Sequence, residues 1–135
     1  MQVFFLDTNV LLDFFLKREG FEYARRILYL SYEHSCVLYV SSLAFSHIAY
    51  IMRKVAKGDA LYEILETLRE MVHIIAVDDT IISNAIHLRA NDFEDAIQYF
   101  SAKKMNVNCI VTNNVKDFTF SDLEVLKPAE FLHRQ

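Results

Sequence analysis

Glycine, proline and cysteine are scarce in this chain of 135 residues, which has two glycines, one proline, two cysteines and no tryptophan. So few chain-breaking residues exclude a collagen-like repeat and argue against low-complexity linkers and extended disorder. Hydrophobic residues make up 53% of the chain, which is enough for one substantial core. We therefore expect a single domain over residues 1–135.

Long apolar runs are also missing. No stretch reaches the roughly 18 uncharged apolar residues that a membrane-spanning helix requires, so we expect no membrane partner. Cys36 and Cys109 each lie within a short apolar run. That setting favours burial over a disulfide framework or a zinc cluster, and a cytoplasmic location is expected.

The chain also lacks an excess of basic residues. The 14 Lys and Arg residues against 18 Asp and Glu residues give a formal net charge of −4 at pH 7. A protein that binds nucleic acid nonspecifically through its overall charge would be basic. Any role with nucleic acid must therefore depend on a local site.

What the chain does have is a series of short apolar runs separated by helical segments. The runs, rich in β-branched and aromatic residues, predict strands at 3–6, 36–40, 72–77 and 108–112. Their continuous apolarity is typical of strands buried on both faces of a parallel sheet. Spacing and capping residues predict helices at 9–17, 20–34, 41–56, 58–72, 78–90 and 92–104, and a last helix beginning at Pro128. This alternation predicts an α/β fold, a three-layer α/β/α sandwich with a central parallel sheet.

Polar residues follow every expected strand: Asp7 after the first, serines at 41–42 after the second, aspartates at 78–79 after the third and the segment 112–117 after the fourth. In open α/β sheets, ligands bind at the carboxyl ends of the strands, near the point where the strand order reverses. We therefore expect the functional site at this edge of the sheet.

Three aspartates are the candidate catalytic residues: Asp7, Asp95 early in a helix, and Asp117 in the loop after the fourth strand. Asp92 lies three residues before Asp95, on the same helix face, and is a further candidate metal ligand. Carboxylates held close together raise one another's pKa, and a divalent cation relieves that repulsion. Oxygen ligands favour Mg²⁺ or Mn²⁺, which activate water for attack on a phosphodiester. The pattern indicates nuclease chemistry.

Each acid also has an ordinary structural explanation. Asp7 and Asp92 suit helix N-caps, Asp95 suits the positive end of a helix, and Asp117 suits a turn. Glu94 points away from the face that Asp92 and Asp95 share, so we expect it to face water.

Three segments resemble the PIN-domain family, in particular the VapC-type toxin ribonucleases of toxin–antitoxin pairs. They are FLDTNVLLDFFLKR, YVSSLAFSHIAYIMRK and NDFEDAIQYFSAKKMNVNCIVTNNVKDF. The resemblance extends over the whole chain and implies an α/β/α fold and an Mg²⁺- or Mn²⁺-dependent endoribonuclease that cleaves RNA as the toxin of such a pair. It also implies a homodimer and an antitoxin partner.

The resemblance also assigns roles to individual residues. Asp7, Asp95 and Asp117 match the family's metal-site acids, and Asp92 matches an additional outer carboxylate. Asn9 and Thr112 fall where small polar residues support the acids. Asn114 falls where many relatives have another Asp or Asn of the metal site.

One position departs from the family. Relatives usually have a glutamate six residues after the serine that matches Ser41, and this chain has His47 there. Histidine does not supply the negative charge of a carboxylate and is a poor partner for Mg²⁺, although Mn²⁺ accepts it. Two functions therefore stay open, an active ribonuclease and an inactive PIN-like domain that binds RNA or a protein.

Two other enzyme classes place an aspartate after a first strand. A haloacid-dehalogenase-like phosphatase needs a second Asp two residues later, where this chain has Asn9. A response-regulator receiver domain needs an acidic pair ahead of its phosphorylated Asp, and the segment MQVFF supplies none. Both classes are disfavoured.

Basic and aromatic residues suggest partners. Arg53, Lys54 and Lys57 cluster at the end of the helix expected at 41–56 and are the candidates for binding RNA phosphates. The segments 9–34 and 41–70 contain more aromatic residues than one small core readily buries, which favours a homodimer or a bound inhibitor helix.

Overall fold

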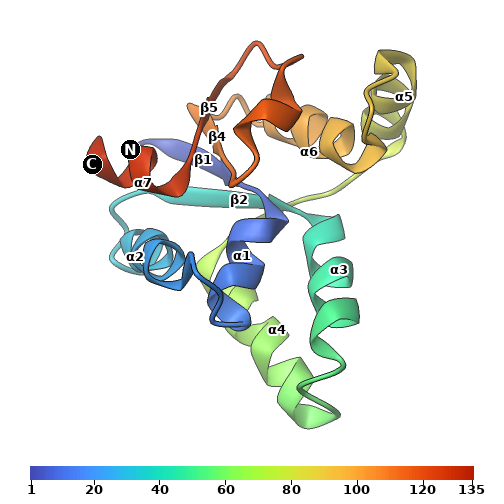
Figure 1. Cartoon of the computed structure of the whole chain (residues 1–135). Helices are drawn as coiled ribbons and strands as arrows, with labels where there is room; N and C mark the ends of the chain where they lie inside the picture. Colours follow the sequence, from blue (N-terminus) through green and yellow to red (C-terminus); the bar gives the residue numbers. More distant parts are fainter.

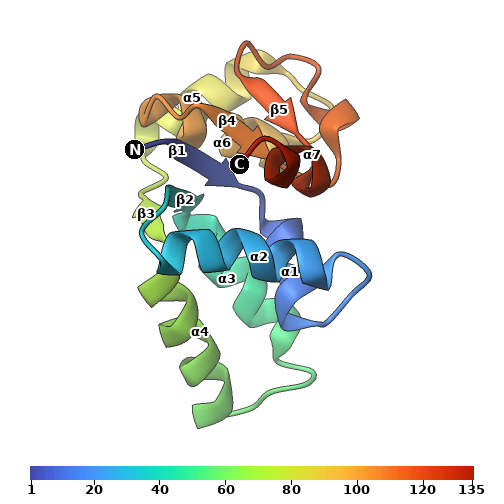
Figure 2. The ribbon, with the colours of Figure 1, turned by 90° about the vertical axis from the view of Figure 1, so that its left-hand side faces the viewer.

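The computed structural model describes residues 1–135, which form a five-stranded sheet with helices on both faces (Figures 1 and 2). All neighbouring strands are parallel, and their order across the sheet is β3-β2-β1-β4-β5. The strands are β1 (Val3–Leu6), β2 (Val37–Ser41), β3 (His73–Ile75), β4 (Cys109–Val111) and β5 (Glu124–Leu126). The predicted α/β/α sandwich with a parallel sheet is confirmed.

The helices follow the predicted segments closely. They are α1 (Thr8–Phe15), α2 (Phe21–Tyr32), α3 (Ser42–Met52), α4 (Asp59–Met71), α5 (Asp79–Leu88), α6 (Phe93–Lys104), α7 (Pro128–His133) and the short 3-10 helix η1 (Val115–Phe118). None of these helices combines the length and the apolar character required to cross a bilayer.

Strand β1 sends its side chains alternately into two cores. Phe4 and Leu6 pack in a core with residues of α1 to α4, whereas Phe5 packs in a second core with residues of α5 and α6. Figure 1 shows these two sets of helices on opposite sides of the sheet. An apolar layer on each face explains why the central strands have continuous apolar sequences.

Both cysteines are free and buried, as the sequence predicts. Cys109 lies on the central strand β4, and burial raises the pKa of its thiol to about 12. A thiol with so high a pKa is unreactive at neutral pH.

One predicted strand is wrong in its surroundings, and one strand is missing from the prediction. The run at 72–77 does not form a strand buried on both faces, because β3 is a three-residue edge strand whose His73 and Ile74 are exposed. Strand β5 is absent from the predicted set, because its apolar residues are interrupted by Glu124 and followed at once by Lys127.

Helix α3 is also shorter than the sequence predicts. It ends at Met52, so Arg53, Lys54 and Lys57 lie in the connection to α4 and do not share a helix. This connection is at the end of α3 that points away from the sheet (Figure 1).

The strand order reverses at β1. From β1 the chain passes to β2 and β3 on one side, and it then returns to β4 and β5 on the other side. This topology leaves a crevice at the carboxyl ends of β1 and β4, which is the usual ligand position in such sheets. Asp7 and Thr112, which directly follow these two strands, are placed there by the fold.

Candidate active site

Asp7 is held in the crevice by both backbone and side-chain contacts. Its backbone N–H donates to the carbonyl oxygen of Val111 at 2.9 Å, which extends the β1–β4 ladder by one residue. Asp7 is only 5% exposed, and this burial raises the pKa of its carboxyl group. Thr112 Oγ1 donates to Oδ2 at 2.7 Å and Gln98 Nε2 donates to Oδ1 at 3.3 Å, and both bonds favour the ionised form.

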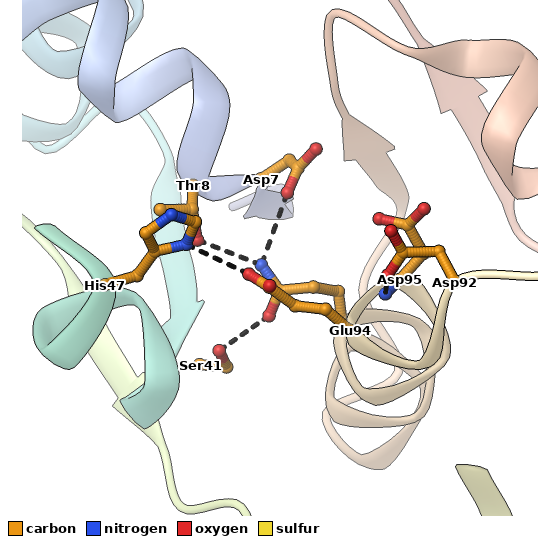
Figure 3. Close-up of polar contacts among 8 residues, drawn as sticks. Asp7, Thr8, Ser41, His47, Asp92, Glu94 and Asp95 are labelled. Atoms are coloured by element: carbon orange, nitrogen blue, oxygen red, sulfur yellow. Dashed lines mark hydrogen bonds and ion pairs between the residues drawn. The ribbon is translucent and has the colours of Figure 1, made fainter. Parts of the chain in front are cut away.

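Gln98 is the site residue that sequence reasoning missed. It is 2% exposed, and its Oε1 accepts a hydrogen bond from Ser41 Oγ at 2.6 Å. Its Nε2 donates to Asp7 Oδ1 and to Thr8 Oγ1, the latter at 3.1 Å, as the dashed lines in Figure 3 show. One buried amide therefore connects α6 to the starts of α1 and α3. The sequence does contain a signal, because Gln98 lies three residues after Asp95 and shares its helix face.

The remaining predicted acids line one cavity. Asp92, Asp95 and Asp117 border a space of about 520 Å³ between the start of α6 and η1. The pKa of Asp95 is raised to about 7, first by desolvation and then by the negative charges of Asp92, Asp7, Asp117 and Glu94. The structure thus brings Asp7, Asp95 and Asp117 within electrostatic range of one another. Such a concentration of like charge favours the binding of a cation.

Asp92 has a structural role that the sequence also suggests. Its Oδ1 accepts a hydrogen bond from the backbone N–H of Asp95 at 3.2 Å, which is the N-cap bond of α6. By contrast, Asp7 occupies the N-cap position of α1 and makes no side-chain capping bond. Its carboxylate therefore faces the crevice and its partners Thr112 and Gln98.

The smaller polar residues of the prediction lie around these acids. The backbone N–H of Asn114 donates to Thr112 Oγ1 at 3.1 Å, so the loop after β4 closes over the threonine that holds Asp7. Asn9 is half-buried in the first turn of α1. From the family resemblance, Asn9 and Thr112 are expected to support the acids. Thr112 donates a hydrogen bond to Asp7, but the second side-chain donor is Gln98 and not Asn9.

Glu94 is exposed and points away from Asp92 and Asp95, as the sequence predicts, but it also has a partner that the sequence does not show. His47 Nδ1 donates to Glu94 Oε1 at 3.0 Å across the space between α3 and α6. Figure 3 shows Asp92 and Asp95 on one side of the first turn of α6 and Glu94 extended to the other side, toward His47. Helical spacing predicts the direction of Glu94 but not its contact with the neighbouring helix α3.

The acidic cavity has basic residues of its own, which differ from the cluster at 53–57. Arg89 and Lys116 line the cavity, whereas Arg53, Lys54 and Lys57 do not. The guanidinium carbon of Arg53 instead lies 4.1 Å from the centre of the Tyr50 ring.

A parallel α/β/α sandwich with acidic residues at the carboxyl end of its first strand has the architecture of a PIN-like fold. A family model described as "PIN domain" matches residues 3–116. The chain belongs to the PIN-domain family, which confirms the family resemblance drawn from the sequence.

The chain is 31% identical over 136 residues to Ribonuclease VapC1 of Aquifex aeolicus (strain VF5), with 96% of this chain and 93% of that protein aligned. Its fold is similar to a DNA-bound VapBC structure from Salmonella typhimurium, with a TM-score of 0.72, 17% identity, and 95% and 99% of the two chains covered. VapBC2 of Rickettsia felis, bound to a promoter DNA fragment, gives a TM-score of 0.70 at 19% identity, with 93% and 98% covered. At these identities, the two solved structures show the fold alone.

The buried amide of Gln98 should contribute strongly to stability. Gln98→Leu keeps the approximate volume but removes the partner of the Ser41 and Thr8 hydroxyl groups and one of the two side-chain hydrogen bonds to Asp7. Since each unsatisfied buried polar group costs about 1–3 kcal/mol, we expect the free energy of unfolding to fall by about 3 kcal/mol. Urea denaturation measures this change, and Gln2→Leu at an exposed position is the control. Equal stabilities of the two variants would contradict the role of the amide.

The raised pKa of Asp95 predicts a stability effect that depends on pH. Its folded-state pKa of about 7 exceeds the ordinary aspartate pKa of about 4, so the ionised carboxylate destabilises the metal-free fold. This cost develops as the pH rises from about 4 to about 7 and is complete above that range.

Asp95→Asn should therefore raise the melting temperature in the presence of a chelator by about 3 °C at pH 8, equivalent to about 1 kcal/mol, and by less at pH 5. Thermal unfolding at both pH values tests this, with Glu63→Gln on the exposed face of α4 as the control. If the melting temperature of Asp95→Asn at pH 8 is no higher than that of the unmodified chain at the same pH, the prediction is wrong.

Proposed function

We propose that this chain is a metal-dependent endoribonuclease of the VapC type that acts as the toxin of a toxin–antitoxin pair. The observation that carries the proposal is the buried carboxylate of Asp7, which is held in the crevice beside Asp95 and Asp117. The 31% identity to a VapC ribonuclease over 96% of the chain supports the same reaction. Because its substrate would be cellular RNA, we place this activity in the cytoplasm.

The donor set fits Mg²⁺ or Mn²⁺ in its chemistry. Asp7, Asp95 and Asp117 would hold the ion, and Asp92 would add an outer negative charge while it caps α6. All the donors are carboxylate oxygens, which hard divalent ions prefer. No three His, Cys, Asp or Glu side chains are placed to share one ion in this structure, so ion binding would require the carboxylates to close together. The bound ion would activate water and offset charge on the phosphate.

The residues around the acids would keep them oriented. Thr112 and Gln98 each hold one oxygen of Asp7, so its carboxylate can turn little. Asn114 would restrain Thr112 through the backbone contact, and Asn9 would border the crevice from α1. Arg89 and Lys116 line the same cavity and would contact the phosphates next to the cleaved bond.

Cleavage assays on structured and single-stranded RNA, with Mg²⁺ and with Mn²⁺, test the proposal. Asp7→Asn should lower the rate by at least about 100-fold, the upper end of the range that even outer-shell partners of a metal site show. Asp59→Asn, an exposed carboxylate in the first turn of α4, is the matched control and should retain activity. If the unmodified chain shows no more metal-dependent cleavage than Asp7→Asn, the proposal that the chain is a ribonuclease is wrong.

The alternative is a PIN-like domain that binds RNA or a protein without cleavage. Two observations favour it, the imidazole of His47 at the position of the usual glutamate and the absence of a preassembled three-residue metal site. RNA binding that is unchanged by a chelator, together with no cleavage in either metal, would support this alternative.

We propose that Arg53, Lys54 and Lys57 bind RNA phosphates away from the reaction centre. The substitution of all three by alanine should weaken RNA binding. It should also reduce the slope of log K against log salt concentration by an amount that corresponds to up to three phosphate contacts. Fluorescence anisotropy over a salt series measures both effects, and Arg25→Ala with Arg26→Ala on α2 is the control. An unchanged salt slope would exclude these residues.

A homodimer and an antitoxin are the partners that we propose. Several tyrosines on α2, α3 and α4 are exposed, which leaves apolar surface for an interface. They are Tyr23, Tyr29, Tyr32, Tyr50 and Tyr62. Light scattering should give twice the 15.8 kDa of one chain, and a single-chain mass would refute the dimer. A protein encoded next to this chain that abolishes RNA cleavage would support the antitoxin, and one that leaves cleavage unchanged would not.

A further inference from the structure

The contact between His47 and Glu94 joins α3 and α6 near the buried amide of Gln98 that holds Asp7. The two residues line a groove of about 440 Å³ between α3 and α6, together with Leu43, Ser46, Tyr50, Phe93 and Ile97. His47 Nδ1 and Glu94 Oε1 are 3.0 Å apart, and both side chains are partly exposed. An exposed ion pair contributes only about 0–1 kcal/mol to stability, so stability alone gives little reason for this contact.

The helical geometry places Glu94 next to the acids. Glu94 precedes Gln98 by four residues, so the two share a face of α6, one turn apart. Gln98 contacts Asp7 directly. Glu94 is also the chain neighbour of Asp95, and its charge acts on both Asp7 and Asp95. Its carboxylate therefore belongs to the same group of negative charges.

Two polar contacts join α3 and α6 on this side of Asp7. The inner contact is between Ser41 and Gln98, which are buried, and the outer contact is between His47 and Glu94. A histidine on α3 thus meets a carboxylate that comes from α6. Figure 3 shows the outer contact on the same side of the crevice as Thr8.

We propose that Glu94 is a further acidic residue of the active site, that His47 positions it, and that its carboxylate supports divalent-ion binding. The hydrogen bond from His47 limits the rotation of the Glu94 side chain and keeps its negative charge beside Asp7 and Asp95. The acid contributed by α6 takes the place of an acid on α3, where this chain has an imidazole. The inference rests on the proposed metal-dependent function.

Metal binding by itself provides the test. Isothermal titration with Mn²⁺ compares the unmodified chain with Glu94→Gln, His47→Ala and Asp7→Asn, after circular dichroism has shown that each is folded. Glu94→Gln should weaken Mn²⁺ affinity by about 10-fold, as expected for residues that support a metal site. His47→Ala should weaken it less, and His47→Gln, which keeps a hydrogen-bond donor, should recover most of that loss. Glu63→Gln, an exposed glutamate of α4, should have no effect.

A double variant tests whether the site requires a carboxylate at this contact, whichever of the two helices carries it. His47→Glu combined with Glu94→Gln returns a carboxylate to this contact from the opposite helix, and we expect it to recover most of the affinity lost in Glu94→Gln. No recovery would contradict the requirement for a carboxylate at this place.

The remaining outcomes distinguish the two proposals. Mn²⁺ binding that Asp7→Asn abolishes and Glu94→Gln leaves unchanged would overturn the role of Glu94 and keep the metal site. No Mn²⁺ binding by the unmodified chain would overturn both.

Discussion

The burial of the Asp7 carboxylate is the constraint on which the rest of the site depends. An ionised group that is only 5% exposed is costly unless hydrogen bonds compensate for the lost water. The hydroxyl of Thr112, which directly follows β4, and the amide of Gln98 in α6 provide that compensation. Ser41 and Thr8 satisfy the remaining groups of the amide, so the network leaves no buried side-chain polar atom without a partner.

This polar network also joins the two layers of helices. Gln98 belongs to α6 on one face of the sheet, whereas Thr8 and Ser41 lie at the starts of helices on the other face. Apolar packing also brings these layers together, as where Leu43 of α3 packs against the core of α5 and α6, but such packing is not directional. Hydrogen bonds with fixed directions therefore define how the two layers meet around Asp7.

The acids of the site oppose stability. The raised pKa of Asp95 shows that its charge is unfavourable in the metal-free fold, and perturbed groups of this kind mark sites of binding or catalysis more often than sites of packing. Both α3 and α6 border the crevice, so either helix can supply a further carboxylate to it. In this chain Glu94 of α6 is the carboxylate between the two helices, and it contacts His47 of α3.

Local sequence patterns determined much of this protein. The run at 3–6 became β1 with the same bounds, the alternation of strands and helices predicted the parallel sandwich, and the strand ends located Asp7, Thr112 and the crevice. These features depend on periodicity and on the order of elements along the chain, which the sequence states directly. The family follows from the same segments and is confirmed by the match over 3–116.

The tertiary structure alone decided the contacts between distant parts of the chain. Gln98 is 91 residues from Asp7 and 57 from Ser41, and Glu94 is 47 from His47. Helical spacing shows which residues share a face but not which element that face meets. The end of α3, the edge position of β3 and the short strand β5 depend likewise on neighbours in space. Sequence reasoning therefore found the acids, and only the fold showed what holds them.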